Sequence, residues 1–170
     1  MLRTAKLPYI CGMEPKIIDL PPKLLVGKKM EMSLIENQTK ELIQSFMPLR
    51  KHVPHMVNTD VYDLIVYPPN YFVTLNPFRP FVKWAGVEVS QIGELPDGLS
   101  FFQIPSGRYA VFTHKGPSSD TGTFEDIFTK WLPNSKHELD DRPHFDIMGE
   151  KYKGDQPDSE EEIWIPIQAG

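Results

Sequence analysis

The chain of 170 residues divides into two halves that can be aligned with each other at three points. The matched segments are Leu20-Pro21 with Ile104-Pro105, Phe46-Met47-Pro48 with Trp131-Leu132-Pro133, and Tyr62-Asp63-Leu64 with Phe145-Asp146-Ile147. Their separations along the chain are 84, 85 and 83 residues. Three ordered matches at nearly constant spacing predict two copies of one structural unit. The alternative is coincidence, because proline-terminated helices are common.

Each half has the pattern of a β-α-β-β unit. In the first half the predicted elements are a strand, turn and strand over 16–32, a helix over 39–46 that ends at Pro48, and strands over 61–67 and 84–90. In the second half they are a strand, turn and strand over 99–114, a helix over 124–131, and strands over 144–148 and 162–167. Seventeen prolines disfavour a helical bundle, because an interior proline breaks a helix. The sequence therefore predicts the α+β class.

Composition excludes several classes of protein and partner. The formal net charge of −5 argues against a direct nucleic-acid partner, which would require a basic face. A single cysteine, Cys11, allows no intrachain disulfide and no thiolate metal cluster, which fits a reducing compartment. No apolar run approaches the ~20 residues of a membrane span, and residues 1–16 lack a signal-peptide core. We expect a cytoplasmic protein with no membrane partner.

Several segments together resemble a known family. They are EPKIIDLPPKLLVGKKMEMS (14–33), IPSGRYAVFTHKGP (104–117), WLPNS (131–135), RPHFD (142–146) and EEIWIPI (161–167). Their order and spacing resemble the GyrI-like, or AraC-type, effector-binding domain, which has a SOUL/GyrI-type duplicated fold. None of the segments is a strict signature by itself.

The resemblance implies one domain over 14–168 after an N-terminal lead-in over 1–13, with repeat 1 at about 14–90 and repeat 2 at about 97–168. The two β-α-β-β units would be related by a pseudo-twofold axis. They would form an antiparallel sheet with one helix per unit and a ligand groove at the junction.

The resemblance also implies a function. A free-standing multidrug-binding member would take cationic or amphipathic aromatic ligands and act as a sensor or sequestering protein. Residues 1–13 are too short for a DNA-binding helix pair, so we expect no DNA-binding domain of its own, and any protein partner is unknown. The alternative is a hydrolase that opens strained electrophilic molecules. A third possibility is a protein–protein inhibitor, as in gyrase-directed relatives.

Asp146 is the central candidate residue, because it interrupts an apolar strand. Alternation places His144, Asp146 and Met148 on one face of that strand, and we expect Phe145 and Ile147 to pack under the helices. Relatives of this family usually carry a ligand-sensing Glu in a Phe-Glu-x-Tyr pattern at this place. Here Asp is shorter and Met148 replaces the tyrosine, which weakens a catalytic role. Alternatively, the Asp146 face is plain exposed sheet.

Glu88 repeats this theme, because Trp84, Gly86 and Glu88 share one strand face, which would suit a flat cation. The alternative is an exposed edge strand. The predicted ligand-binding residues are Tyr67, Trp84, Glu88, Tyr109, Phe145, Asp146, Met148 and Trp164. Glu88, Tyr109 and Asp146 are the catalytic candidates if the protein is a hydrolase. We expect no cofactor and no metal, because the histidines lack a zinc-type spacing.

Overall fold

The computed structural model describes residues 14–170, and the expected lead-in over 1–13, including Cys11, lies outside the described residues. The strands are β1 (Lys16–Leu20), β2 (Lys23–Met32), β3 (Val61–Val66), β4 (Phe81–Val89), β5 (Ser100–Ile104), β6 (Gly107–Lys115), β7 (His137–Leu139), β8 (His144–Met148) and β9 (Glu160–Ala169). The helical segments are α1 (Thr39–Arg50), α2 (Gly122–Asp126), the π-helical η1 (Ile127–Trp131) and α3 (Leu132–Asn134). The predicted α+β class is confirmed.

The strands form one antiparallel sheet whose order reflects the duplication. The order is β1-β6-β9-β8-β3-β4-β2-β5, and β7 pairs with β9 beside this path. Strands β2, β4 and β3 of the first half occupy the positions that β6, β9 and β8 occupy in the second half. The two halves meet where β3 pairs with β8. This arrangement has the pseudo-twofold character that the sequence repeat predicts.

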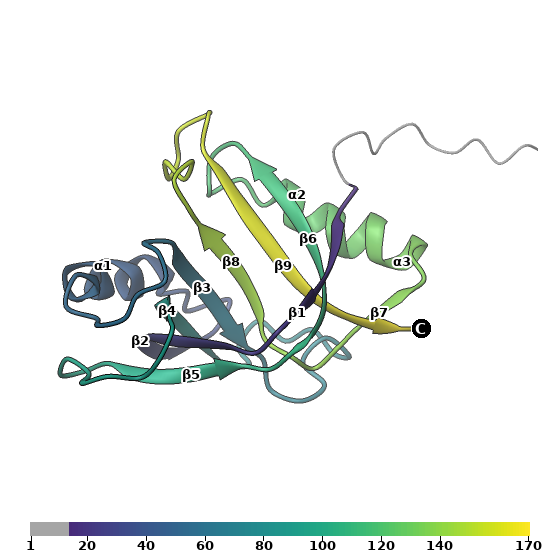
Figure 1. Cartoon of the computed structure of the whole chain (residues 1–170). Helices are drawn as coiled ribbons and strands as arrows, with labels where there is room; N and C mark the ends of the chain where they lie inside the picture. The colour runs from purple at the N-terminus through teal and green to yellow at the C-terminus, as the bar shows by residue number, and fades with distance from the viewer. Residues whose placement is uncertain (1–13) are drawn as a thin grey trace, which may run out of the picture.

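Each half contributes the outermost strand of the other half. The first-half strand β1 pairs with β6, and the second-half strand β5 pairs with β2. A proline follows each of these edge strands, at Pro21 and Pro105, and lacks the N–H that would continue the ladder. The chain therefore crosses from one half-sheet to the other at these prolines, as Figure 1 shows for β1 and β5.

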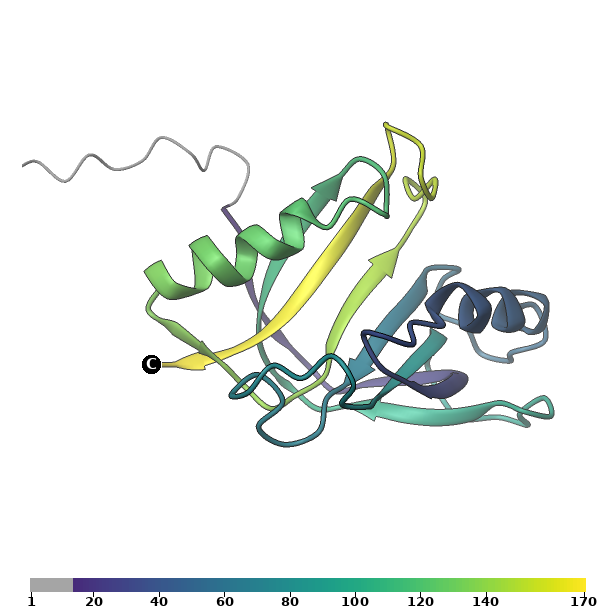
Figure 2. The same cartoon turned by 180° about the vertical axis from the view of Figure 1, so that it is seen from behind.

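Both helices lie on the same side of the sheet, with β8 and β3 between them (Figure 2). Helix α1 buries Leu42 and Phe46 in a core with residues of β2 and β4. Ile127 of η1 is buried in a second core with residues of β6 and β9. The prediction that Pro48 ends α1 is wrong, because the helix continues to Arg50. A proline in the last turn removes only one helical hydrogen bond there, so the helix can continue past it.

Two glycines allow a close backbone approach between β2 and β4. Gly27 is the direct partner of Gly86, and a Cβ atom on Gly27 would lie 2.2 Å from the carbonyl oxygen of Ala85. No side chain fits at that distance, so glycine is required for this pairing. Within the described chain, no helix has the length and apolar character needed to cross a membrane.

Candidate functional site

Asp63 and Asp146 are direct partners across the central strand pair β3–β8. Directly opposed residues of an antiparallel pair have Cβ atoms about 4.5–5.5 Å apart, and like charges there destabilise a sheet. The two acids hold equivalent positions in the two repeats. The fold therefore brings two carboxyl groups together at the junction of its halves, facing the side that carries the helices.

A groove of about 760 Å³ lies over this acid pair. Strands β3, β4, β8 and β9 contribute to it, α1 and the start of α2 provide its sides, and segments 118–121 and 152–155 close one end. Its acidic lining residues are Asp63, Asp120, Asp146, Asp155 and Glu161, and its basic ones are Lys40 and Lys83. Apolar lining residues are Ile43, Phe124, Met148 and Ile163. With all of these groups ionised, the groove carries three more negative than positive charges.

Lys83 is the cation closest to the acid pair. Its Nζ lies 3.3 Å from Asp63 Oδ1 and donates to Thr39 Oγ1 at 2.7 Å. Alternation places Lys83 on the groove face, because Ala85, two residues later, is the register partner of Asp63. Only 11% of the Lys83 side chain is exposed, so its ammonium group is held at the floor of the groove.

Asp146 has a pKa raised well above its ordinary value of 3.8. Desolvation is the main cause, and the negative charges of Asp63 and Glu161 add to it, while Lys83 opposes it. The pKa of Glu161 is also raised, first by desolvation. Glu161 shares this face because Ile163, two residues later, pairs with Asp146. The groove is thus an acidic site whose deepest carboxyl group readily holds a proton.

His114 holds one end of the groove in place. It is the register partner of Glu161 and is only 3% exposed. Its Nε2 lies 2.9 Å from the Pro117 carbonyl oxygen and therefore donates to it, and its Nδ1 lies 2.8 Å from Thr123 Oγ1. These two contacts fix the chain between β6 and α2 beside the acids.

Three of the predicted ligand residues lie on the helix-bearing face. Asp146 and Met148 line the groove. Tyr67 lies beyond the end of β3, and its pKa is raised by burial and then by the charges of Tyr71, Asp146 and Asp63. The Tyr67 hydroxyl is therefore within electrostatic reach of the acid pair.

The other five lie on the opposite face of the sheet. Trp84, Tyr109, Phe145 and Trp164 are buried there in an aromatic core, and Tyr109 is fully buried. The Tyr109 hydroxyl donates to the Pro143 carbonyl oxygen at 2.8 Å, and burial raises its pKa to about 12. The structure does not bring these residues together with Asp146.

Glu88 is separated from Asp146 by the sheet itself. Ala85 pairs with Asp63, and Glu88 follows Ala85 by three residues, so the two acids project from opposite faces. Lys23 Nζ lies 3.2 Å from Glu88 Oε1, and the Tyr62 hydroxyl lies 3.4 Å from the same oxygen. The hydrolase arrangement of Glu88, Tyr109 and Asp146 thus has no common site.

One expectation about β8 is half right. Asp146 does face the groove, but Phe145 and Ile147 do not pack under the helices. They belong to the aromatic core, because the sheet buries residues on both faces. Strand alternation gives two faces but does not say which one the helices cover.

Sequence reasoning missed Lys83, His114 and Glu161. Glu161 was available from the pattern, because Glu161, Ile163, Ile165 and Ile167 alternate along one strand face, and the three isoleucines are buried. Its acidic neighbours Glu160 and Glu162 hide this signal, because an acidic run is by itself typical of a solvated segment. Among residues 14–170, no group of three or more His, Cys, Asp or Glu has an arrangement that could hold a metal ion.

Comparison with known proteins gives consistent matches over nearly the whole chain. Residues 13–168 match the family model described as GyrI-like small molecule binding domain. The transcriptional regulator BrlR of Pseudomonas aeruginosa is 27% identical over 161 residues, which are 93% of this chain and 57% of BrlR. The chain thus spans little more than half of that relative.

Solved structures share the fold at low sequence identity. SAV2435 bound to tetraphenylphosphonium has a TM-score of 0.66 and 14% identity, over 92% of this chain and 94% of that one. The EcmrR C-terminal domain has a TM-score of 0.66 and 15% identity, over 91% and 97%. A hydrolase from Listeria innocua has a TM-score of 0.57 and 9% identity, over 94% of each chain.

Proposed function

Because the chain belongs to the GyrI-like small molecule binding domain family, we propose that the groove over Asp63 and Asp146 captures cationic, amphipathic aromatic compounds. The observation that carries this proposal is the opposed pair of acids beneath a partly apolar groove. A second feature supports it, since the groove has more acidic than basic side chains.

The chemistry favours a bulky cation whose charge is spread over rings. Such a cation loses little hydration on entering the groove, so burial of its rings against Phe124, Met148 and Ile163 supplies most of the affinity. The Asp146 carboxylate then selects for positive charge, because a neutral analogue would leave it without a counter-ion. The tetraphenylphosphonium complex of SAV2435, which shares this fold, supports the choice of that cation as a probe.

We propose that the bound state is used for sensing or sequestration. The likeness to the regulator BrlR supports a sensing role in transcription control. The groove would convert the presence of a cation into a change in the positions of α1 and α2, which form its sides.

The test compares a cation with a neutral molecule of similar shape. Tetraphenylphosphonium and triphenylphosphine oxide are titrated into the wild type and the Asp146→Asn variant by calorimetry. We expect the variant to bind the cation about 10-fold or more weakly and the neutral compound with little change. Glu88→Gln is the matched control, because it removes an acid from the opposite face. Equal losses for the two compounds would refute the proposal.

A hydrolase remains the second candidate, and the raised pKa values of Asp146 and Glu161 favour it. A carboxyl group whose pKa is raised holds its proton more tightly and can act as a general acid toward a strained ring. With Glu88 and Tyr109 on the opposite face, Glu161 would be the second acid. Hydrolysis of an aryl epoxide that is unaffected by Asp146→Asn and Glu161→Gln would exclude this assignment.

A further inference from the structure

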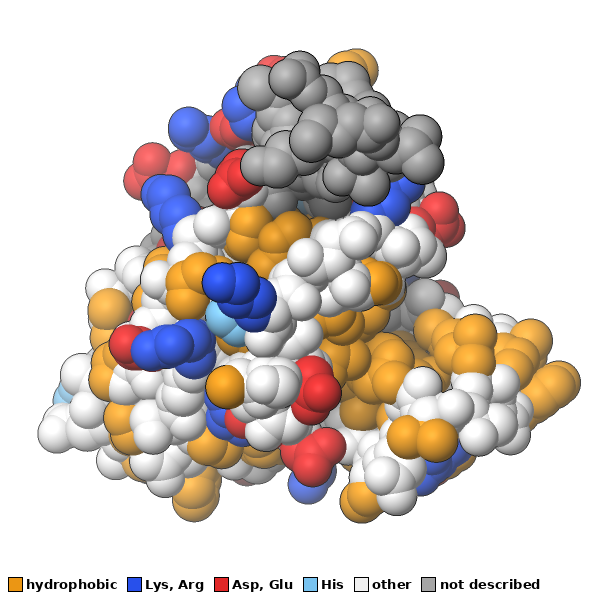
Figure 3. Space-filling model, turned by 90° about the vertical axis from the view of Figure 1, so that its right-hand side faces the viewer, with side chains coloured by type: hydrophobic (Ala, Val, Ile, Leu, Met, Phe, Trp, Pro, Cys, Tyr) orange, Lys and Arg blue, Asp and Glu red, His pale blue; other side chains and the backbone are white. Residues whose placement is uncertain are grey.

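A second cavity, of about 360 Å³, lies apart from the groove. It is formed by the segment 67–73 after β3 and by the connection between β7 and β8, and no lining residue is shared with the groove. Figure 3 views the molecule from the side that carries α3 and β7, and hydrophobic side chains gather there around a hollow.

Unpaired buried polar atoms concentrate at this cavity. Within the described residues, three buried side-chain nitrogen or oxygen atoms have no hydrogen-bond partner: Tyr71 Oη, Arg142 Nη1 and His144 Nδ1. All three residues line the cavity. Buried polar groups in native proteins are almost always paired, so their coincidence at one cavity calls for an explanation.

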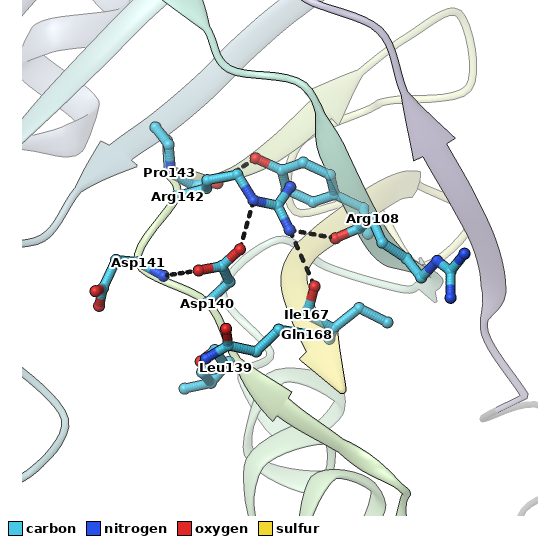
Figure 4. A network of polar contacts seen from close by, with 9 residues as sticks. Arg108, Leu139, Asp140, Asp141, Arg142, Pro143, Ile167 and Gln168 are labelled. Carbon is cyan, nitrogen blue, oxygen red and sulfur yellow. Dashed lines mark hydrogen bonds and ion pairs between the residues drawn. The ribbon is translucent and has the colours of Figure 1, made fainter. Parts of the chain in front are cut away.

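The unpaired Nη1 atom of Arg142 is explained by the other contacts of its guanidinium group. Its guanidinium group binds Asp140 Oδ2 at 2.8 Å and the Ile167 carbonyl oxygen at 3.0 Å, as Figure 4 shows. The guanidinium carbon also lies 4.7 Å from the centre of the Tyr109 ring, whose face attracts N–H groups and cations. The Arg142 charge is thus neutralised within the protein, and two unpaired groups remain, on Tyr71 and His144.

His144 and Tyr71 are both uncharged in this setting. His144 is 5% exposed and stacks on Phe72 with ring centres 5.4 Å apart, and burial lowers its pKa to about 3. Tyr71 is 3% exposed, with its ring centre 4.6 Å from that of Tyr67. His144 Nδ1 offers one hydrogen bond, the Tyr71 hydroxyl can donate and accept, and neither group offers a charge. Asp141, the remaining acid of the lining, points away from the Arg142 network in Figure 4.

We propose that this cavity is a second binding site, for a small uncharged aromatic molecule that carries one hydroxyl or N–H group. The volume is at the lower end for ligand pockets, which suits one or two fused rings. The rings of Tyr67, Tyr71 and Phe72 provide flat apolar surfaces, and the ligand's polar group completes the hydrogen bonds of His144 and Tyr71. The ligand proposed for this cavity is uncharged, whereas the ligand proposed for the groove is a cation.

The π-helical segment η1 supports a site at this place. Phe128, within η1, stacks on Phe72 at 5.6 Å and on His144 at 6.2 Å, and contacts Phe124 of the groove at 4.8 Å. π-Helical turns are rare and often mark functional sites. Phe128 of this turn thus links Phe124 of the groove to Phe72 and His144 of the second cavity.

The test uses 2-naphthol, with naphthalene as the matched probe that lacks the hydroxyl group. Both are titrated into the full chain by fluorescence, with wild type, Tyr71→Phe and His144→Phe. Tyr71→Phe keeps the ring and removes its hydroxyl group, and His144→Phe replaces the imidazole with an aromatic ring that has no polar atom. We expect one saturable 2-naphthol site, about 5-fold weaker in each variant, with naphthalene binding unchanged.

Asp146→Asn and tetraphenylphosphonium separate this site from the groove. We expect Asp146→Asn to leave 2-naphthol affinity unchanged, and Tyr71→Phe to leave tetraphenylphosphonium affinity unchanged. If His144→Phe fails to fold, Tyr71→Phe and a 2-naphthol-induced shift of the His144 ring nitrogen resonances in the wild type decide the matter. Absence of saturable 2-naphthol binding, as in a cavity that holds only water, would overturn the proposal. Equal affinities in the wild type and Tyr71→Phe would also overturn it.

Discussion

The Lys83 ammonium group lies 3.3 Å from Asp63 Oδ1 at the floor of the groove, so one lysine partly neutralises the acids there. It also opposes the raised pKa of Asp146. A bound cation would occupy the same negative region, so Lys83 and a cationic ligand compete for the acids.

Replacement of Lys83 should therefore strengthen cation binding. We expect Lys83→Met to raise tetraphenylphosphonium affinity about 3- to 10-fold, because repulsion between like charges disappears. The variant should also lose stability, since Asp63 is left without its ion pair. Calorimetry and thermal unfolding measure the two effects, and Lys29→Met, which removes a lysine from the opposite face of the sheet, is the control. Weaker cation binding by Lys83→Met would contradict this view.

Cation binding should depend on pH through Asp146. Its pKa is raised in the empty protein, and a cation favours the ionised carboxylate, so binding lowers that pKa and releases a proton. Affinity should fall as pH drops through the raised pKa and level off above it. Calorimetry in buffers of different ionisation enthalpy measures the released proton. We expect the Asp146→Asn variant to bind the cation with the same affinity at every pH, and Glu161→Gln to keep the pH dependence of the wild type. These two results would assign the effect to Asp146 alone.

Asp146 should also reduce the stability of the empty protein. Its folded-state pKa lies above the unfolded value of 3.8, so the folded state holds its proton more tightly. Stability therefore falls as pH rises from 3.8 through the folded-state pKa. Asparagine cannot ionise, so Asp146→Asn should raise the free energy of unfolding by roughly 1 kcal/mol above that range, the size typical of single substitutions. Denaturant unfolding at pH 4 and pH 8 measures this gain, and a gain confined to pH 4 would contradict the predicted effect of the Asp146 charge.

Gly27 should tolerate no side chain. A Cβ atom there would meet the Ala85 carbonyl oxygen at 2.2 Å, so the paired backbones of β2 and β4 would have to move apart. We expect Gly27→Ala to destabilise the fold by about 3 kcal/mol or more, as overpacking against rigid backbone does. Gly149→Ala is the control, because its nearest contact, with Asp60 Oδ1, is 3.4 Å. Urea unfolding that ranks the two variants equally would contradict the requirement for glycine.

Much of the fold was predictable because local patterns and tertiary packing agree. The sequence pattern predicts β8 over its full length, 144–148, and the offset between the halves places Asp63 and Asp146 at equivalent positions, which agrees with their direct pairing. The three-residue strand β7 was missed, since His137–Leu139 is too short to show a period.

The candidate site was less predictable, because its membership depends on which face the helices cover. Trp84 and Glu88 share a face with each other, as expected, but it is the face away from Asp146. Lys83 lies just before the strand predicted over 84–90, whereas β4 begins at Phe81, so the sequence pattern does not place Lys83 on a strand face. Which residues share a face with Asp146 depends on the register between strands that are far apart in the sequence. The periodicity within a single strand does not reveal that register.

The exchange of edge strands limits how the protein can respond to a ligand. Because β1 is built into the second half-sheet and β5 into the first, neither half can swing away from the other as a rigid body without breaking a strand ladder. The junction over Asp63 and Asp146 is therefore a fixed floor and not a hinge. Admission of a ligand and any signal of its arrival must then involve the layer above that floor, the helices and loops that the sheet carries on one side.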